Sequence, residues 1–80
     1  EALERAFQID PEHRGIRKSL GYVYAWNGEL ARAALLLDGI GEAQYEMEEY
    51  TLWWQNNQQP KLAEQASNLA QMLKLELNTP

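Results

Sequence analysis

Four short breaks divide the chain into five segments, and they constrain its fold more than any other feature. The breaks are DP at 10–11, NG at 27–28, DGIG at 38–41 and NNQQP at 56–60. The residue before a proline avoids the helical region, and glycine readily adopts the positive φ at which helices end. Tight turns at these breaks predict short elements that run antiparallel to their neighbours.

Apolar residues within the segments recur at helical spacing. We expect helices over about 1–9, 14–26, 29–38, 42–56 and 61–77. Regular apolar stripes predict the buried faces of the last two helices: Ala43, Met47, Tyr50 and Trp54, then Leu62, Ala66, Leu69, Leu73 and Leu77. No segment has the character of a strand, so the expected fold class is all-α, with about five helices in antiparallel helix-turn-helix units.

Residues at the breaks also predict how the helices begin and end. Asp10 and Pro11 suit the cap and the first residue of the second helix. Pro60 suits the first residue of the last helix, and Asn78 suits a cap at its end.

Charge and composition argue against several classes of protein. The 80 residues suit one small domain, and the net charge of −5 comes from 12 acidic and 7 basic side chains. Nucleic-acid binding needs a basic surface, so we expect no nucleic-acid partner. The longest apolar run, at 33–37, is far shorter than the roughly 20 residues that span a bilayer, so we expect no membrane partner. Because the chain starts at Glu1 with what resembles the end of a helix, we interpret it as a piece of a longer protein.

The residue types that carry catalysis are sparse. His13 is the only histidine and falls in a turn, which argues against a two-histidine metal site. Ser19 and Ser67 have no evident histidine partner to activate them. The DGIGE stretch lacks the lysine and the preceding strand of a phosphate-binding loop. We therefore expect no catalytic, cofactor-binding or metal-binding residues and no enzymatic activity.

One stretch follows the pattern of a known helical repeat, W-x2-L-G-x2-Y, then A-x3-F, then a closing proline. The matching residues are Leu20, Gly21, Tyr24, Ala33 and Leu37, and Pro11 closes the preceding unit in register. Arg17 replaces the opening tryptophan, and Leu37 replaces the phenylalanine. Small residues such as Gly21 and Ala33 suit places where two helices pack closely. The chain thus resembles the tetratricopeptide repeat family.

A second, weaker unit follows 30 residues later. The spacing of Arg17, Leu20, Tyr24, Ala33 and Ile40 is repeated by Met47, Tyr50, Trp54, Ala63 and Ala70. Thr51 replaces the glycine, so we expect looser packing in this helix pair. The resemblance implies a fragment of a tetratricopeptide-like α-solenoid in a single domain, 1–80. The end of one repeat would occupy 1–10, the best-matched repeat 12–41 and a degenerate repeat 42–77.

Tetratricopeptide arrays generally bind peptides or partner proteins on the concave face formed by the first helix of each pair. The resemblance therefore implies a protein–protein interaction scaffold. Its concave face would carry Lys18, Tyr22, Ala25 and Trp26 from the second helix, with Tyr45, Glu48, Glu49 and Leu52 from the fourth. The alternative interpretation of Tyr22 and Trp26 is packing against a neighbouring repeat. One subclass of the family binds a terminal carboxylate with a lysine and an asparagine; Lys18 matches the lysine, but Tyr22 replaces the asparagine, so we do not expect this clamp.

Acidic residues concentrate in the stretch 33–60, which contains no basic residue. They include Asp38, Glu42, Glu46, Glu48 and Glu49. Two interpretations remain open: a carboxylate-lined surface that attracts basic partners, or a solvated face with acids near a helix start. Trp53 also has two interpretations, because it points roughly 100° away from Trp54. It either covers the last helix, which we expect, or forms an exposed contact.

Two functions of different kinds remain open. In the first, the chain binds a peptide or a partner protein. In the second, it is a structural spacer or self-association segment with no ligand of its own, and Leu3 and Phe7 of the first helix form an apolar edge that stacks on other copies. A homo-oligomer through exposed terminal helices belongs to the second. The absence of cysteine is compatible with both the cytosol and the periplasm, and we favour the cytoplasm.

Overall fold

The computed structural model describes residues 2–77, with side chains through residue 75. Within this range five α-helices follow one another: α1 (Ala2–Ile9), α2 (Arg14–Trp26), α3 (Leu30–Leu37), α4 (Gly41–Asn56) and α5 (Pro60–Leu77). The described residues contain no strand, which confirms the all-α expectation. The sequence breaks lie where these helices end. Asn78, expected to cap α5, lies outside the described residues.

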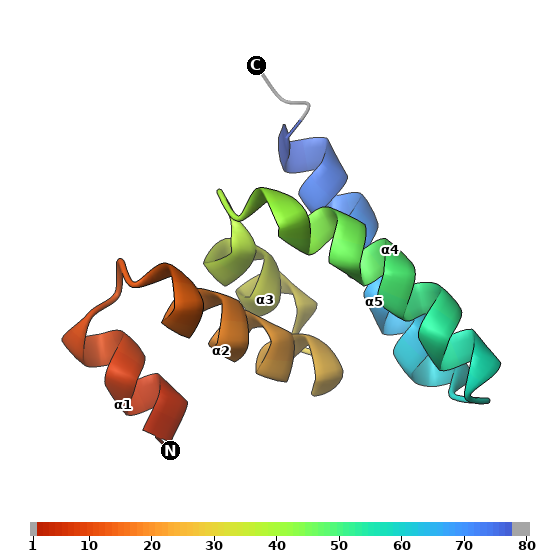
Figure 1. The fold of residues 1–80 in the computed structure, drawn as a ribbon, viewed down its shortest axis with the longest axis horizontal. Helices are drawn as coiled ribbons and strands as arrows, with labels where there is room; N and C mark the ends of the chain where they lie inside the picture. The colour runs from red at the N-terminus through yellow and green to blue at the C-terminus, as the bar shows by residue number, and fades with distance from the viewer. Residues whose placement is uncertain (1, 78–80) are drawn as a thin grey trace.

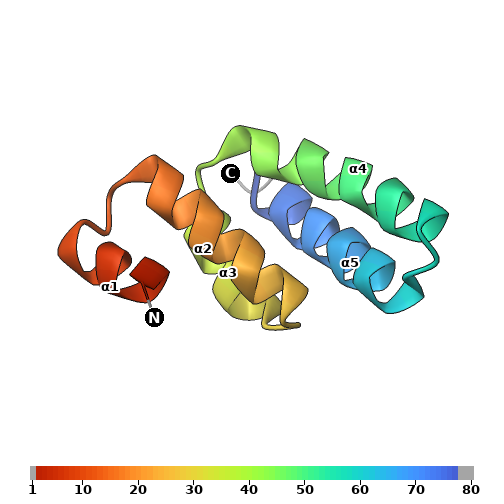
Figure 2. The ribbon, with the colours of Figure 1, turned by 60° about the horizontal axis from the view of Figure 1, so that its bottom comes forward.

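The helices form two layers. In Figure 1, α2 and α4 lie on the viewer's side, and α3 and α5 lie behind them. Turning the molecule places α3 below α2 and α5 below α4, so that two antiparallel hairpins, α2–α3 and α4–α5, become visible (Figure 2). α1 lies at one end of the array and packs against α2. The molecule is therefore flat, with extents of 37 × 34 × 17 Å.

The turns of the two hairpins have the same backbone geometry. Gly28 follows α2 with a φ of 84°, and Gln58 follows α4 with a φ of 60°. In each turn the next residue donates its N–H to the carbonyl five residues before it, at 2.9 Å. A left-handed residue at this place lets the chain satisfy the last carbonyls of the helix. The same turn geometry therefore recurs 30 residues apart, with glycine at position 28 and glutamine at position 58.

The core lies between the two hairpins. Its largest fully buried side chains are Leu37, Met47 and Leu69, and Leu20 is buried beside α1 and α3. Alanines without exposed surface surround them and allow close packing: Ala25, Ala33, Ala43 and Ala66. The stripes expected on α4 and α5 contribute Ala43, Met47, Ala66, Leu69 and Leu73 to this core, and Tyr50 and Trp54 are partly buried against it. Leu62, expected in the α5 stripe, is only partly buried and does not belong to the core. The side chain of Leu77, expected in the same stripe, lies outside the described part of the chain.

Gly21 marks a close approach of α2 to α3. A Cβ atom placed on it would lie 2.8 Å from both Cγ and Cδ2 of Leu37, well inside ordinary carbon–carbon contact. The glycine is therefore required by packing. Thr51, at the equivalent place in α4, donates its hydroxyl to the carbonyl of Met47 at 2.9 Å. Looser packing of the α4–α5 pair stays a prediction.

The start of α2 differs from the expectation at Asp10 and Pro11. His13 is the N-cap, and its Nδ1 accepts a hydrogen bond from the backbone N–H of Ile16 at 3.2 Å. Asp10 is not the cap because its own N–H donates back to the carbonyl of Ala6 at 3.0 Å, which ties it to the end of α1. Pro11 falls in the intervening turn.

Arg17, which stands where the repeat pattern has tryptophan, caps the end of α3. Its Nε donates to the carbonyl of Leu36 at 3.1 Å, and its Nη2 donates to that of Asp38 at 3.1 Å. The last carbonyls of a helix have no partner inside the helix, and a cation there also favours the negative end of the helix dipole. Arg17 thus joins α2 to α3 by polar contacts.

Candidate functional site

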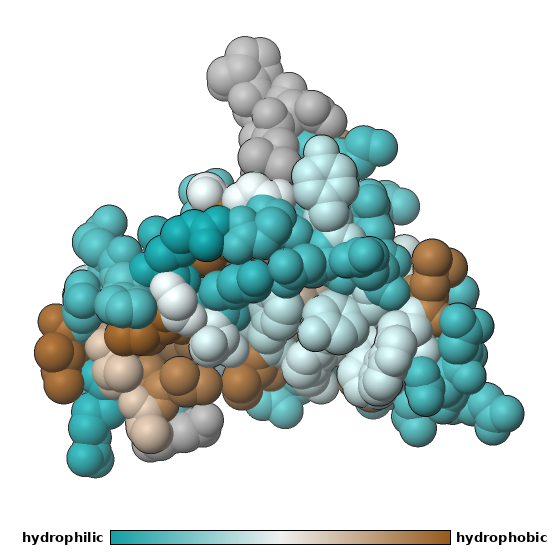
Figure 3. Space-filling view, in the orientation of Figure 1, coloured by the Kyte–Doolittle hydropathy of each residue, from teal (hydrophilic) through white to brown (hydrophobic). Residues whose placement is uncertain are grey.

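Aromatic side chains bridge α2 and α4, the two helices on the viewer's side in Figure 1. Tyr22 and Trp26 come from α2, and Tyr50, Trp53 and Trp54 come from α4; we call these five residues the aromatic layer. Figure 3 shows residues of intermediate hydropathy gathered on this face below a band of hydrophilic residues. The layer is the surface feature that most distinguishes this face.

The rings of the aromatic layer meet edge to face across the two helices. The ring centroids lie 6.0 Å apart for Tyr22 and Tyr50, 5.1 Å for Trp26 and Tyr50, and 5.6 Å for Trp26 and Trp54. Each such contact is worth about 0.5–1.5 kcal/mol beyond the burial of area. Residues four apart lie one above the other on a helix, which aligns the α2 pair with the α4 pair. Tyr22 and Trp26 therefore pack against α4 and hold the hairpins together.

A row of polar contacts runs beside the aromatic layer. Arg14 pairs with Glu42. Lys18 Nζ lies 3.0 Å from Glu46 and 3.4 Å from Glu42, and Tyr22 donates its hydroxyl to Glu46. These two acids are thus engaged by α2, although no basic residue lies near them in the sequence. We call these contacts the polar row.

The polar row shifts the pKa values of its members. The hydrogen bond from Arg14 lowers the pKa of Glu42 to about 2. The hydrogen bonds from Tyr22 and then from Lys18 lower the pKa of Glu46. Burial, followed by the contact with Glu46, raises the pKa of Tyr22. Both carboxylates are therefore charged and the phenol is neutral over the physiological range.

An open groove of about 720 Å³ lies next to the aromatic layer. Its lining residues are Glu46, Glu49, Tyr50 and Trp53. Trp53 is 52% exposed, while its ring rests against Trp54 with the centroids 4.6 Å apart. Glu49 is exposed, and its side chain makes no hydrogen bond or ion pair with any residue that the structure describes. The groove therefore offers a supported indole ring and an unpaired carboxylate on one helix face.

The eight residues suggested for the concave face do not all line the groove. Lys18, Tyr22 and Trp26 lie along α2 within the polar row and the aromatic layer, and Glu49 lines the groove. Three more, Tyr45, Glu48 and Leu52, do not line the groove. Helical residues turn by roughly 100° each, so positions 48 and 52 lie roughly 100° or more from 53, whereas 45 lies one turn before 49.

Contacts with α5 confirm this separation. Glu48 and Leu52 line a shallow pocket together with Ala70 and Gln71 of α5. Tyr45 is 64% exposed and does not line the groove. The expectation that Ala25 lies on the concave face is wrong, because this residue is completely buried against the core.

Three groove residues were missing from the sequence-based set: Glu46, Tyr50 and Trp53. The expectation that Trp53 covers α5 is wrong, because half of its surface is exposed and it lines the groove. The spacing of 46, 49, 50 and 53 was the available signal, since these positions fall on one side of a helix. The second interpretation of Trp53, an exposed contact, describes the structure.

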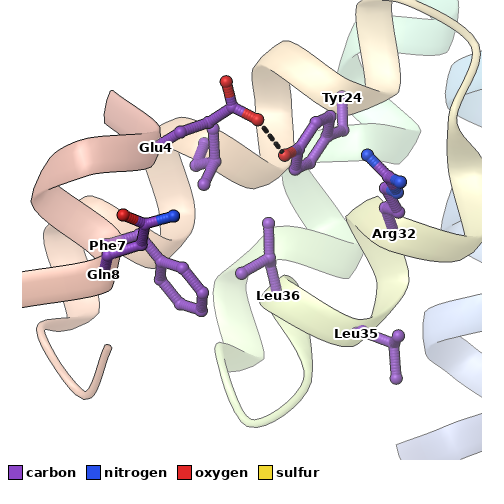
Figure 4. Close-up of a pocket in the computed structure, with 8 residues that line it drawn as sticks. Glu4, Phe7, Gln8, Tyr24, Arg32, Leu35 and Leu36 are labelled. Carbon is purple, nitrogen blue, oxygen red and sulfur yellow. Dashed lines mark hydrogen bonds between the residues drawn. The ribbon is translucent and has the colours of Figure 1, made fainter. Parts of the chain in front are cut away.

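A smaller pocket of about 360 Å³ separates α1 from α3 (Figure 4). Phe7 of α1 and Leu36 of α3 contribute apolar walls, and Leu35, which is 72% exposed, lies at its margin. The hydroxyl of Tyr24 donates to Glu4 at 2.8 Å and joins α1 to α2. This pocket lies among the α1, α2 and α3 residues and is separate in composition from the groove.

Comparisons with known proteins give no relative from which a function could be transferred. No protein-family model matches the chain, and neither the curated proteins nor the solved structures give a significant match. Among the described residues, no group of three acidic, histidine or cysteine side chains is placed to hold a metal ion. No helix in that part of the chain is long and apolar enough to cross a membrane. The class that fold and groove define is an all-helical protein with an aromatic groove on one face.

Proposed function

We propose that the chain is a protein-interaction module of the tetratricopeptide type and that it binds a peptide or partner protein in the groove on the α2–α4 face. The observation that carries this proposal is Trp53, an indole half exposed in a groove and in edge-to-face contact with Trp54. A rigid aromatic ring offers contact area without much loss of side-chain entropy, which is why tryptophan is enriched at binding hot spots.

Two features support the tetratricopeptide-like arrangement. The hairpins α2–α3 and α4–α5 have matching turns, at Gly28 and Gln58. The contact of Gly21 with Leu37 joins the two parts of the repeat pattern, its glycine and its closing apolar residue. In this arrangement α2 and α4 are the first helices of successive pairs, and they form one layer (Figure 1).

The fixed geometry of the groove wall supports binding without rearrangement. Tyr50 is held by Tyr22 and Trp26, and the polar row fixes Glu46. A preorganised wall avoids part of the entropy cost that a flexible surface incurs on binding. The proposed function requires no catalytic residue, cofactor or metal.

A selection from a random peptide library on the immobilised chain tests the proposal. We expect selected peptides to bind the original chain and to lose binding to Trp53→Ala. Leu52→Ala is the matched control, because Leu52 is 62% exposed on the same helix and lies on the other side. Circular dichroism should show both variants folded. A library that yields no binder, or binders lost equally in both variants, contradicts the proposal.

A second candidate function, self-association, is favoured by the smaller pocket between α1 and α3. Leu35 is 72% and Ile9 80% exposed near this end of the array. Apolar surface of this kind favours contact with another copy. Sedimentation equilibrium tests it: a mass that rises with concentration and returns to the monomer value in Leu35→Asp supports stacking, and a monomer at all concentrations rejects it.

A further inference from the structure

We infer that the groove selects basic peptides, and that it does so by stacking an arginine side chain on Trp53 while Glu49 pairs with the guanidinium. This inference rests on the proposed function and adds the chemistry of the ligand. It depends on which charges on the α2–α4 face are already neutralised and which are free.

The polar row leaves the groove with an acidic surplus. Glu42 and Glu46 are matched by Arg14 and Lys18 of α2. The remaining cation of α2, Arg17, donates its hydrogen bonds to carbonyls at the end of α3. Glu49 has no such partner in the part of the chain that the structure describes. The net charge of −5 adds a long-range attraction for cations.

The position of Glu49 relative to Trp53 suits a guanidinium group. The two residues are four apart on α4 and line the same groove, so their side chains are neighbours on one helix face. Arginine has a planar cation that stacks on an aromatic face and still donates hydrogen bonds to a carboxylate. A lysine ammonium keeps the charge contact but gives up most of the stacking.

The same contacts disfavour an acidic ligand. Lys18 lies over the ring of Tyr22 in the aromatic layer, and two glutamates already hold it. A ligand carboxylate would have to displace Glu46 from Lys18 and from the hydroxyl of Tyr22. It would also meet the unpaired charge of Glu49. Like charges in such proximity oppose binding.

Titration of the isotopically labelled chain with three short capped peptides of alanine and glutamine tests the inference. The peptides differ only in carrying three arginines, three lysines or three glutamates. We expect the arginine peptide to shift the NMR signals of Glu49 and of the Trp53 indole N–H. The lysine peptide should bind about threefold more weakly, and the glutamate peptide should produce no shift. Raising the salt concentration should weaken the binding of the arginine peptide, because salt screens the attraction between charges.

Two matched pairs of variants test whether the arginine peptide contacts Glu49 and Trp53. Glu49→Gln should lower the affinity for the arginine peptide about fivefold. Glu48→Gln, one residue away but facing α5, should change that affinity less than about twofold. Trp53→Leu should reduce the preference for arginine over lysine, and Leu52→Ala should preserve it. Equal effects of Glu49→Gln and Glu48→Gln, or binding of the glutamate peptide, overturn the inference.

The peptide library separates this inference from the proposed function. If neutral or acidic peptides are selected and their binding depends on Trp53, the groove is a binding site but its assigned preference is wrong. If neither the library nor the arginine peptide binds at Trp53, the proposed function and the inference both fail.

Discussion

At the scale of single residues, Gly21 shows how one absent Cβ atom sets the distance between two helices. Because an added Cβ would lie 2.8 Å from the buried side chain of Leu37, Gly21→Ala must displace that side chain. Overpacking costs about 1–3 kcal/mol, and the higher helix propensity of alanine offsets about 1 kcal/mol of it. We expect a net destabilisation of up to about 2 kcal/mol, measured by urea unfolding.

Measuring Gly21→Ala both in the original chain and in a Leu37→Ala background tests whether packing causes the loss. In a Leu37→Ala background the clash is gone, so Gly21→Ala should become neutral or stabilising. Gly41→Ala is the control, because no atom lies within 4 Å of a Cβ placed there. A Gly21→Ala variant that is equally destabilising in both backgrounds would mean that backbone conformation, not packing, requires the glycine.

Arg17 supplies a second test at the same scale. Arg17→Ala removes hydrogen bonds to the carbonyls of Leu36 and Asp38 at the end of α3. Because these bonds are charge-assisted but partly open to water, we expect a loss of about 1–2 kcal/mol in the free energy of unfolding. Arg5→Ala, on the exposed side of α1, should stay within about 0.5 kcal/mol of the original chain. Equal losses in both variants would show a general charge effect.

At the scale of elements, the turn after α4 contains backbone strain at Gln58 that a glycine would relieve. Gln58 has a φ of 60°, in the region that costs a side-chain-bearing residue about 1–2 kcal/mol. We expect Gln58→Gly to stabilise the chain by about 0.5–1 kcal/mol, since glycine loses part of this gain through its greater freedom when unfolded. Gly28→Gln, the reverse change at the matching turn, should destabilise. Thermal unfolding measures both, and opposite signs are the expected result.

The sequence predicts the helices well and the contacts between them poorly. The breaks at 10–11, 27–28, 38–41 and 56–60 end helices for local reasons, through proline and residues of positive φ. The partner of Arg17 could not be predicted in this way, because the carbonyls that it caps lie 19 to 21 residues later. Likewise the spacing within α4 identifies its sides, but not which side meets α2. The spacing alone therefore does not separate Leu52, which lines a pocket with α5, from Glu49, which lines the groove.

At the scale of the whole molecule, the polar row joins the two hairpins and makes their association sensitive to acid. The pKa of Glu42 is about 2 in the folded chain, against an ordinary value of 4.5. A lowered folded-state pKa means that the contact adds stability above about pH 4.5 and that this contribution is lost as the pH falls toward 2. We expect the free energy of unfolding to decrease over that interval.

Variants of the pair assign this loss to the contact between α2 and α4. Glu42→Gln and Arg14→Gln should each reduce the dependence of stability on pH between about 4.5 and 2. The double variant should resemble Glu42→Gln, because that change already removes the contact with Arg14 as well as the weaker one with Lys18. Urea unfolding at a series of pH values measures this, and additive effects of the two changes would contradict a shared contact.

The aromatic layer also has an optical consequence. The chain contains three tryptophans, and all of them, Trp26, Trp53 and Trp54, belong to this layer. Emission excited selectively from tryptophan therefore originates in this layer, with Trp53 the indole most open to solvent quenchers. Any molecule that covers the groove will change the emission or its quenching without an attached dye. The protein thus carries its own fluorescent reporter at the surface where we propose that it binds.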